Sequence, residues 1–140
     1  MWREVERLNN MWIFKRIKFL YWDIHKKVKF GIQRIIRGYS NQDLYAFHYN
    51  WVERHYKMLK DFRKHSPKYP TDITEEEWDI ILDEMIYHLE MMDEERVTEV
   101  LKRGMPKDWM PACNLVWEIM ERNRKAFFDL FSKHFYDMWY

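Results

Sequence analysis

Cysteine, glycine and proline are all scarce in this chain of 140 residues, which holds one Cys, three Gly and four Pro. Because Cys113 is the only cysteine, an intrachain disulfide is excluded and a reducing compartment is expected. Three glycines are too few for a phosphate-cradling loop, and no nucleotide-binding or serine-hydrolase motif is present. So few turn-forming residues favour a small number of long helices over many short strands.

Long apolar runs are also missing, because no run exceeds a few residues and a membrane span needs about 20. The first residues carry Arg3, Glu4, Glu6 and Arg7 in place of a basic start followed by an apolar stretch. We therefore expect neither a membrane span nor a signal peptide.

Aromatic residues, by contrast, make up 19% of the chain, and so many rings need burial in a core or against a partner. The net charge of +1 hides a strong division. Residues 1–37 hold ten Lys or Arg against three Asp or Glu, whereas residues 71–100 hold one Arg against twelve Asp or Glu. Either the basic and acidic segments neutralise each other, or one of them faces a partner.

Apolar residues recur at helical spacing along most of the chain, which predicts an all-α fold. We expect a bundle of about four helices with a long basic N-terminal helix, forming a single domain over residues 1–140. The predicted helices are about 3–37, 41–65, 75–92, with a possible extension to 103, and 114–137. Thr74 and Glu77 predict a capping box for the third helix, and Gly38 and Ser40 suit a helix end and a helix start.

The spacing also predicts which side chains are buried. The second helix is expected to bury Leu44, Phe47 or His48, Trp51, His55, Met58 and Phe62. The third is expected to bury Trp78, Ile81, Leu82, Met85, Leu89 and Met92.

Three stretches of the chain are distinctive: Gly38-Tyr39-Ser40-x-x-Asp43; Tyr69-Pro70-x-x-x-Thr74-x-Glu76-Glu77-Trp78-Asp79-x-Ile81-Leu82-Asp83-x-Met85-Ile86; and Phe131-Ser132-Lys133-His134-Phe135-Tyr136-Asp137-Met138-Trp139. Together they resemble a family of small all-α proteins encoded by tailed bacteriophages. The resemblance implies a phage origin, expression in the cytoplasm of an infected bacterial host and an all-α fold. It implies no reaction.

Residues for catalysis or metal binding do not stand out. The six histidines include no Glu-x-x-His pair of the kind that a dimetal helical bundle uses, and no group that would orient Cys113 as a nucleophile can be named. We therefore predict a protein that is not an enzyme, with no catalytic residues, no metal site and no cofactor.

The basic N-terminal helix supplies the partner-binding candidates, in which cations alternate with rings: Trp12, Lys15, Arg16, Phe19, Trp22, Lys26 and Phe30. Such a surface suits a protein partner, or nucleic acid through phosphate contacts and base stacking. Pairing with the acidic helix is the simpler alternative. If this helix is an interaction element, its four rings should be unusually exposed.

The acidic helix supplies a second set of candidates on its charged face: Glu76, Asp79, Asp83, Glu90 and Glu94. Their simplest interpretation is a solvated face, and the alternative is a mimic of nucleic acid that meets a basic groove. We expect a non-catalytic accessory protein that binds a host or phage macromolecule, foremost a protein, in host takeover or anti-defence. A nucleic-acid-binding module and a minor virion or assembly protein are the alternatives. A membrane surface is disfavoured as a partner, and a homo-oligomer is left open.

Overall fold

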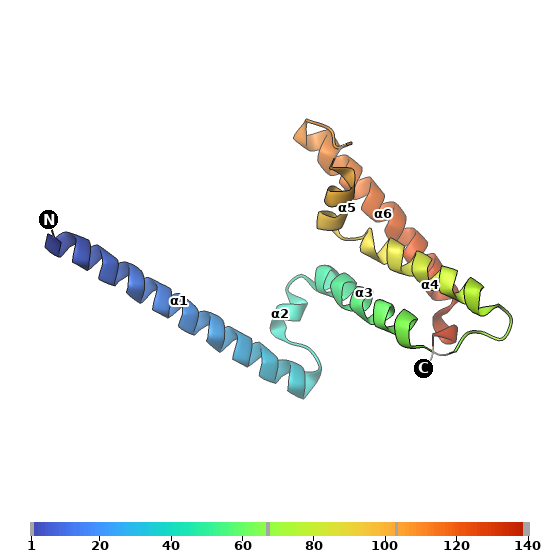
Figure 1. Cartoon of the computed structure of the whole chain (residues 1–140), viewed down its shortest axis with the longest axis horizontal. Helices are drawn as coiled ribbons and strands as arrows, with labels where there is room; N and C mark the ends of the chain where they lie inside the picture. The colour runs from blue at the N-terminus through green and yellow to red at the C-terminus, as the bar shows by residue number, and fades with distance from the viewer. Residues whose placement is uncertain (1, 67, 103, 139–140) are drawn as a thin grey trace. The chain divides into compact units, whose positions relative to one another are not determined.

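The computed structural model describes residues 2–66, 68–102 and 104–138, with side chains from residue 11 onward. These residues form six α-helices and one short 3-10 helix and include no strand (Figure 1), so the predicted all-α fold is confirmed. The helices fall into two compact units, residues 1–47 and residues 48–140. The single domain expected over residues 1–140 stays a prediction.

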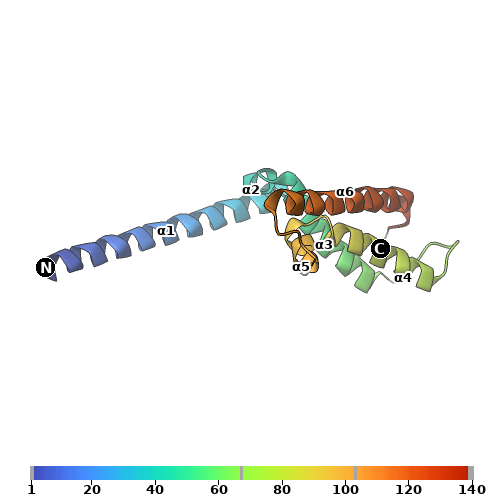
Figure 2. The same ribbon diagram turned by 90° about the horizontal axis from the view of Figure 1, so that it is seen from above.

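Unit 1 consists of helix α1, Trp2–Arg37, and the short helix α2, Asn41–Leu44. The predicted first helix, 3–37, is confirmed, and Figure 2 shows α1 as one unbroken helix. Gly31 lies within it. Gly38 ends it with a φ of +77°, a left-handed conformation that glycine adopts without the steric cost of a Cβ. Its amide bonds the carbonyl of Arg34 at 2.9 Å, which satisfies one of the last carbonyls of the helix.

The second predicted helix, 41–65, is wrong as a continuous element. It is divided into α2 and helix α3, Phe47–His65, by a turn at Tyr45 and Ala46. The amide of Tyr45 bonds Gln42 three residues back at 3.2 Å, which ends the α-helical pattern of bonds four residues apart.

Unit 2 holds most of α3 together with α4, Glu75–Glu90, α5, Glu94–Leu101, α6, Trp109–Lys133, and the 3-10 helix η1, Phe135–Asp137. Helices α4 and α6 lie side by side in Figures 1 and 2, and α5 also packs against α6. The main core joins three helices through Val52, Leu59, Trp78, Leu82, Met85, Leu89 and Phe127. A smaller core under α5 holds Met91, Val97 and Val116.

Two other predicted boundaries change. The possible extension of the third helix to 103 is a separate helix, because the side chain of Asp93 caps α5 by accepting from the amide of Arg96 at 3.0 Å. The last helix begins at Trp109 rather than 114 and ends at Lys133 rather than 137, with η1 following it. Pro111 fits inside its first turn, where a missing N–H costs no hydrogen bond.

Among the residues that the structure describes, no helix is both long enough and apolar enough to cross a membrane.

Candidate functional site

The partner-binding candidates lie on one side of α1, which we call the basic aromatic face: Trp12, Lys15, Arg16, Phe19, Trp22, Lys26 and Phe30. Their place follows from the helix itself, because residues three, four and seven apart share one side. A helix of 36 residues carries them as one rigid row rather than on a loop.

Three of the four rings on this face are exposed. The exposed fractions are 75% for Phe19, 59% for Trp12 and 53% for Trp22, while Phe30 is half-buried. Large rings are rarely left this open without a function, because removing apolar surface from water is favourable. Exposed rings such as these are what a helix that binds a partner requires.

The cations of the face are arranged around its rings. The guanidinium of Arg16 lies 4.9 Å from the ring centre of Trp12, a cation–π contact. A shallow hollow of about 340 Å³ on this face is lined by Lys15, Lys18, Phe19, Trp22, Asp23 and Lys26. The face therefore combines positive charge with apolar surface at one place.

The acidic candidates are divided among different settings. Arg63 of α3 bonds Asp79 at 2.9 Å and Asp83 at 3.1 Å, so these two carboxylates tie α4 to α3. Glu90 accepts from the hydroxyl of Tyr56 at 3.2 Å. Glu76 and Glu94 lie exposed in the first turns of α4 and α5, where negative charge favours the helix dipole. Most of these carboxylates thus have structural roles.

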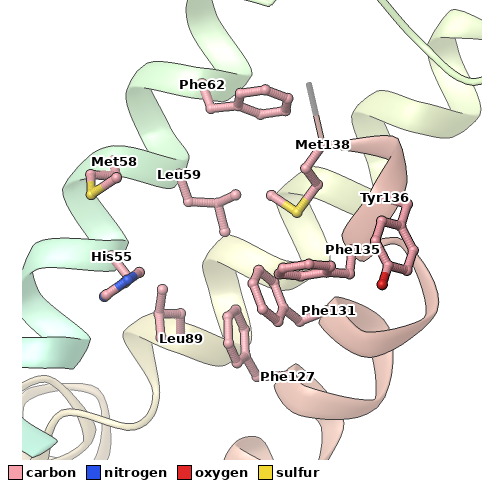
Figure 3. A pocket seen from close by; sticks show the side chains of 10 residues that line it. All are labelled: His55, Met58, Leu59, Phe62, Leu89, Phe127, Phe131, Phe135, Tyr136 and Met138. Carbon is pink, nitrogen blue, oxygen red and sulfur yellow. The ribbon is translucent and has the colours of Figure 1, made fainter. Parts of the chain in front are cut away.

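Unit 2 has an apolar pocket of about 450 Å³ between α3, α4 and the end of α6 (Figure 3). Its lining is almost wholly apolar: Met58, Leu59, Phe62, Leu89, Phe127, Phe131, Phe135, Tyr136 and Met138, together with His55. Nδ1 of His55 lies 2.7 Å from the carbonyl of Trp51, and its ring stacks on the ring of that residue at 4.1 Å. His55 is therefore held by Trp51 as part of the pocket wall.

Two partly buried polar pairs were not predicted from the sequence. Nδ1 of His88 lies 2.8 Å from Oδ1 of Asn123, and Nδ1 of His134 lies 3.0 Å from Oδ2 of Asp137. His134 also packs edge-on against Trp78 at 5.6 Å. The spacing of three residues between His134 and Asp137 could have indicated the second pair. No local spacing indicates the first, because His88 and Asn123 lie on two different helices. The first pair joins α4 to the middle of α6, and the second links the end of α6 to η1, so both stabilise the fold.

The described residues contain no group of three or more His, Cys, Asp or Glu side chains placed to hold a metal ion. Cys113 is exposed near the start of α6 and lines a second hollow of unit 2 beside Asn114 and Trp117. Comparison with known proteins finds no family model, no curated protein and no solved structure that matches this chain.

Proposed function

We propose that the chain is a non-catalytic interaction protein that binds another protein through the basic aromatic face of α1. Host takeover or anti-defence in a phage-infected bacterium is the setting that the family resemblance suggests for it. The observation that carries the proposal is the exposure of Trp12, Phe19 and Trp22 on a single rigid helix.

The chemistry of the face favours a protein partner. Trp, Phe and Arg are the residues that contribute most at protein interfaces, because they combine large apolar area with directional polar groups. The cations between the rings favour a partner with an acidic surface, which would also speed association. Unit 2, with its own cores, would then serve as the folded body that carries α1.

The experiment is a capture assay with the full chain. The exposed thiol of Cys113 lies outside the face and allows the protein to be immobilised at one point. The protein is incubated with bacterial lysate, and bound proteins are identified by mass spectrometry. The double variant Phe19→Ala, Trp22→Ala should lose the captured partner, because it removes apolar area from the centre of the face.

The matched control removes two large exposed side chains of unit 2. Tyr136 is 91% exposed and Met110 is 59% exposed, and both belong to unit 2. The double variant Tyr136→Ala, Met110→Ala should keep the partner. Capture that survives the Phe19→Ala, Trp22→Ala change would contradict the proposal, and so would equal loss in both variants.

A second candidate is nucleic-acid binding, which the hollow among Lys15, Lys18, Lys26, Phe19 and Trp22 favours. Lysines there would contact phosphates and the rings would stack on bases. Anisotropy of labelled single- and double-stranded oligonucleotides at two salt concentrations tests it. Affinity that does not fall with salt, or that is unchanged in Lys15→Glu, Lys26→Glu, rules this mode out.

A further inference from the structure

Helix α1 has a second exposed face, which lies opposite the basic aromatic face. Between Ile13 and Ile35, counted at about 100° per residue, it covers about 120° of the helix and includes no charged residue. We call it the aliphatic stripe, and it consists of Ile13, Phe14, Ile17, Leu20, Tyr21, Ile24, Val28, Gly31, Ile32 and Ile35. Its nine side chains other than Gly31 are between 46% and 85% exposed. So large an exposed apolar surface on one helix indicates that another surface binds it.

The stripe is straight because its pattern repeats every 11 residues. Ile13, Ile17, Leu20 and Ile24 are spaced by four, three and four, and the same spacing leads from Ile24 to Ile35. Such a repeat corresponds to about 3.67 residues per turn, close to the value of about 3.6 for a straight α-helix. Figures 1 and 2 both show α1 as a straight helix. The stripe therefore stays on one side for about 33 Å, from Ile13 to Ile35.

Cations line both edges of the stripe. Lys18 and Lys29 follow one edge, and Arg16, Lys27 and Arg34 follow the other, where Lys27 pairs with Asp23 and Arg34 with Asp43. Their stems are long enough to lie along apolar surface while their charges reach outward. A surface that covers the stripe must therefore be apolar in its middle, anionic at both edges and flat over the length of the stripe.

The same stripe of a second copy does not meet these requirements, because it would bring the cationic edges of the two helices together. Residues 1–37 alone carry ten Lys or Arg against three Asp or Glu. Nucleic acid is anionic but has no apolar floor for isoleucine and leucine side chains. A phospholipid surface with anionic headgroups has an apolar interior, negative charge at its boundary and a planar form.

We propose that the aliphatic stripe of α1 lies in the plane of an anionic phospholipid surface, with its edge cations at the level of the headgroups. From the sequence alone, a membrane surface is less favoured than a protein as the partner of this chain. The exposure of the whole aliphatic stripe favours a membrane surface as the partner of this face. In that position the basic aromatic face points away from the lipid. The proposal is independent of the protein partner, because it uses the opposite side of the helix.

The first test is flotation of the full chain with lipid vesicles. Vesicles of phosphatidylcholine alone are compared with an equimolar mixture of phosphatidylcholine and phosphatidylglycerol. We expect the anionic vesicles to carry at least about tenfold more protein, because each Lys or Arg near such a surface adds about 1 kcal/mol of attraction. The double variant Ile17→Glu, Ile24→Glu should fall to the level of neutral vesicles. Both positions are more than half exposed, so circular dichroism should show unchanged helicity.

The matched control is Phe19→Ala, Trp22→Ala, which changes the opposite face of the same helix. It should float with anionic vesicles as the unchanged chain does. Loss of vesicle binding in this variant with retention in Ile17→Glu, Ile24→Glu would overturn the proposal. If Phe19→Ala, Trp22→Ala loses protein capture but floats normally, the lipid proposal is supported and is shown to be separate from the proposed function.

The second test places a reporter on each face. Cys113→Ser removes the one native thiol, and Ile24→Cys or Phe19→Cys then carries a nitrobenzoxadiazole dye. With anionic vesicles the dye at position 24 should shift to the blue and brighten, while the dye at position 19 should not. A blue-shifted dye at position 24 before vesicles are added would overturn the proposal, since the stripe would already be covered within the protein or by a second copy. No response at position 24 would overturn it as well.

Discussion

Arg34 and Asp43 form a two-point ion pair that joins the end of α1 to the short helix α2. Nε of Arg34 donates to Oδ2 of Asp43 at 3.1 Å, and Nη2 donates to Oδ1 at 2.8 Å. The same carboxylate accepts from the backbone amide of Ser40 at 2.7 Å, which completes the capping box of α2. Gly38, Ser40 and Asp43 thus have structural roles in unit 1.

The Asp43 pair makes a prediction about pH. The Arg34 guanidinium, followed by the Ser40 amide, holds the pKa of the Asp43 carboxyl well below its usual range. Since the folded pKa is lowered, the stabilisation is complete above the ordinary carboxyl pKa of about 3.9 and is lost as pH falls toward the lower folded value. Carbon-detected NMR titration of the carboxylate should show no protonation at the pH where an unpaired aspartate titrates.

Two variants separate the causes of this lowered pKa. Arg34→Gln should raise the pKa of Asp43 the most, because the guanidinium is the largest cause. Ser40→Ala should raise it less, because the backbone amide of residue 40 still donates to the carboxylate. Equal shifts in the two variants would contradict this ranking.

The capping box of α4 makes a prediction about stability. The amide of Glu77 donates to Oγ1 of Thr74 at 3.2 Å, and the amide of Thr74 donates to Oε2 of Glu77 at 2.9 Å. Thr74→Ala should lower the free energy of unfolding by about 1 kcal/mol, since it leaves one amide without its side-chain acceptor. Urea unfolding followed by tryptophan fluorescence measures it. Thr71→Ala, at an exposed threonine in the preceding turn, is the control and should change little.

The capping box also shows where sequence reasoning works. Local signals specify α4 well, since Thr74 and Glu77 mark its start and the predicted residues Trp78, Leu82 and Met85 are buried. These signals depend only on residues three or four apart, so the rest of the fold does not alter them.

The buried side of α3 shows where it fails. Val52 and Leu59 are its buried residues, whereas the predicted Phe47 and Met58 are exposed. The prediction assumed one helix from residue 41, and the turn at Tyr45 and Ala46 breaks the phase of that pattern. The side of a helix that faces its neighbours is then set by packing, which spacing alone does not encode.

The candidate site shows the same limit for function. The spacing of Ile13, Ile17, Leu20 and Ile24 is that of an ordinary core stripe, yet these side chains are exposed. Periodicity reports that one side of a helix is apolar but not what covers it. The alternation of rings and cations on the opposite side was visible in the sequence, and only the structure gives their exposure.

The buried contact between α4 and α6 makes a third prediction. Nδ2 of Asn123 donates to the carbonyl of Ile119 at 2.8 Å, so its Oδ1 must accept the hydrogen on Nδ1 of His88. Asn123 is only 5% exposed. Asn123→Ala should lower the free energy of unfolding by about 1–3 kcal/mol, because the imidazole N–H is left partly buried without its acceptor. Asn114→Ala, at an exposed asparagine of the same helix, should cost far less. Equal losses in urea unfolding would show that the contact has no special role.

The fourth prediction concerns Arg96, the one cation among the acidic residues 71–100. Its guanidinium lies 3.9 Å from the ring centre of Tyr56, and Nη2 donates to Oε2 of Glu53 at 3.1 Å, so it joins α5 to α3. Arg96→Ala should lower the free energy of unfolding by about 1–2 kcal/mol, from the lost cation–π contact and charged hydrogen bond. Arg96→Lys should recover only part of this, because an ammonium keeps the charge but cannot stack as a plane.

Arg124 provides the comparison for Arg96. It pairs with Glu121 at 2.6 Å within α6, on a side chain that is 48% exposed. A solvent-exposed pair of this kind within one helix contributes little, because water and salt screen the two charges. Arg124→Ala should therefore unfold at nearly the same urea concentration as the unchanged chain, while Arg96→Ala unfolds earlier. If both variants unfold together, Arg96 contributes no more than a surface charge, and α5 is held in unit 2 by the packing of Val97 against α6.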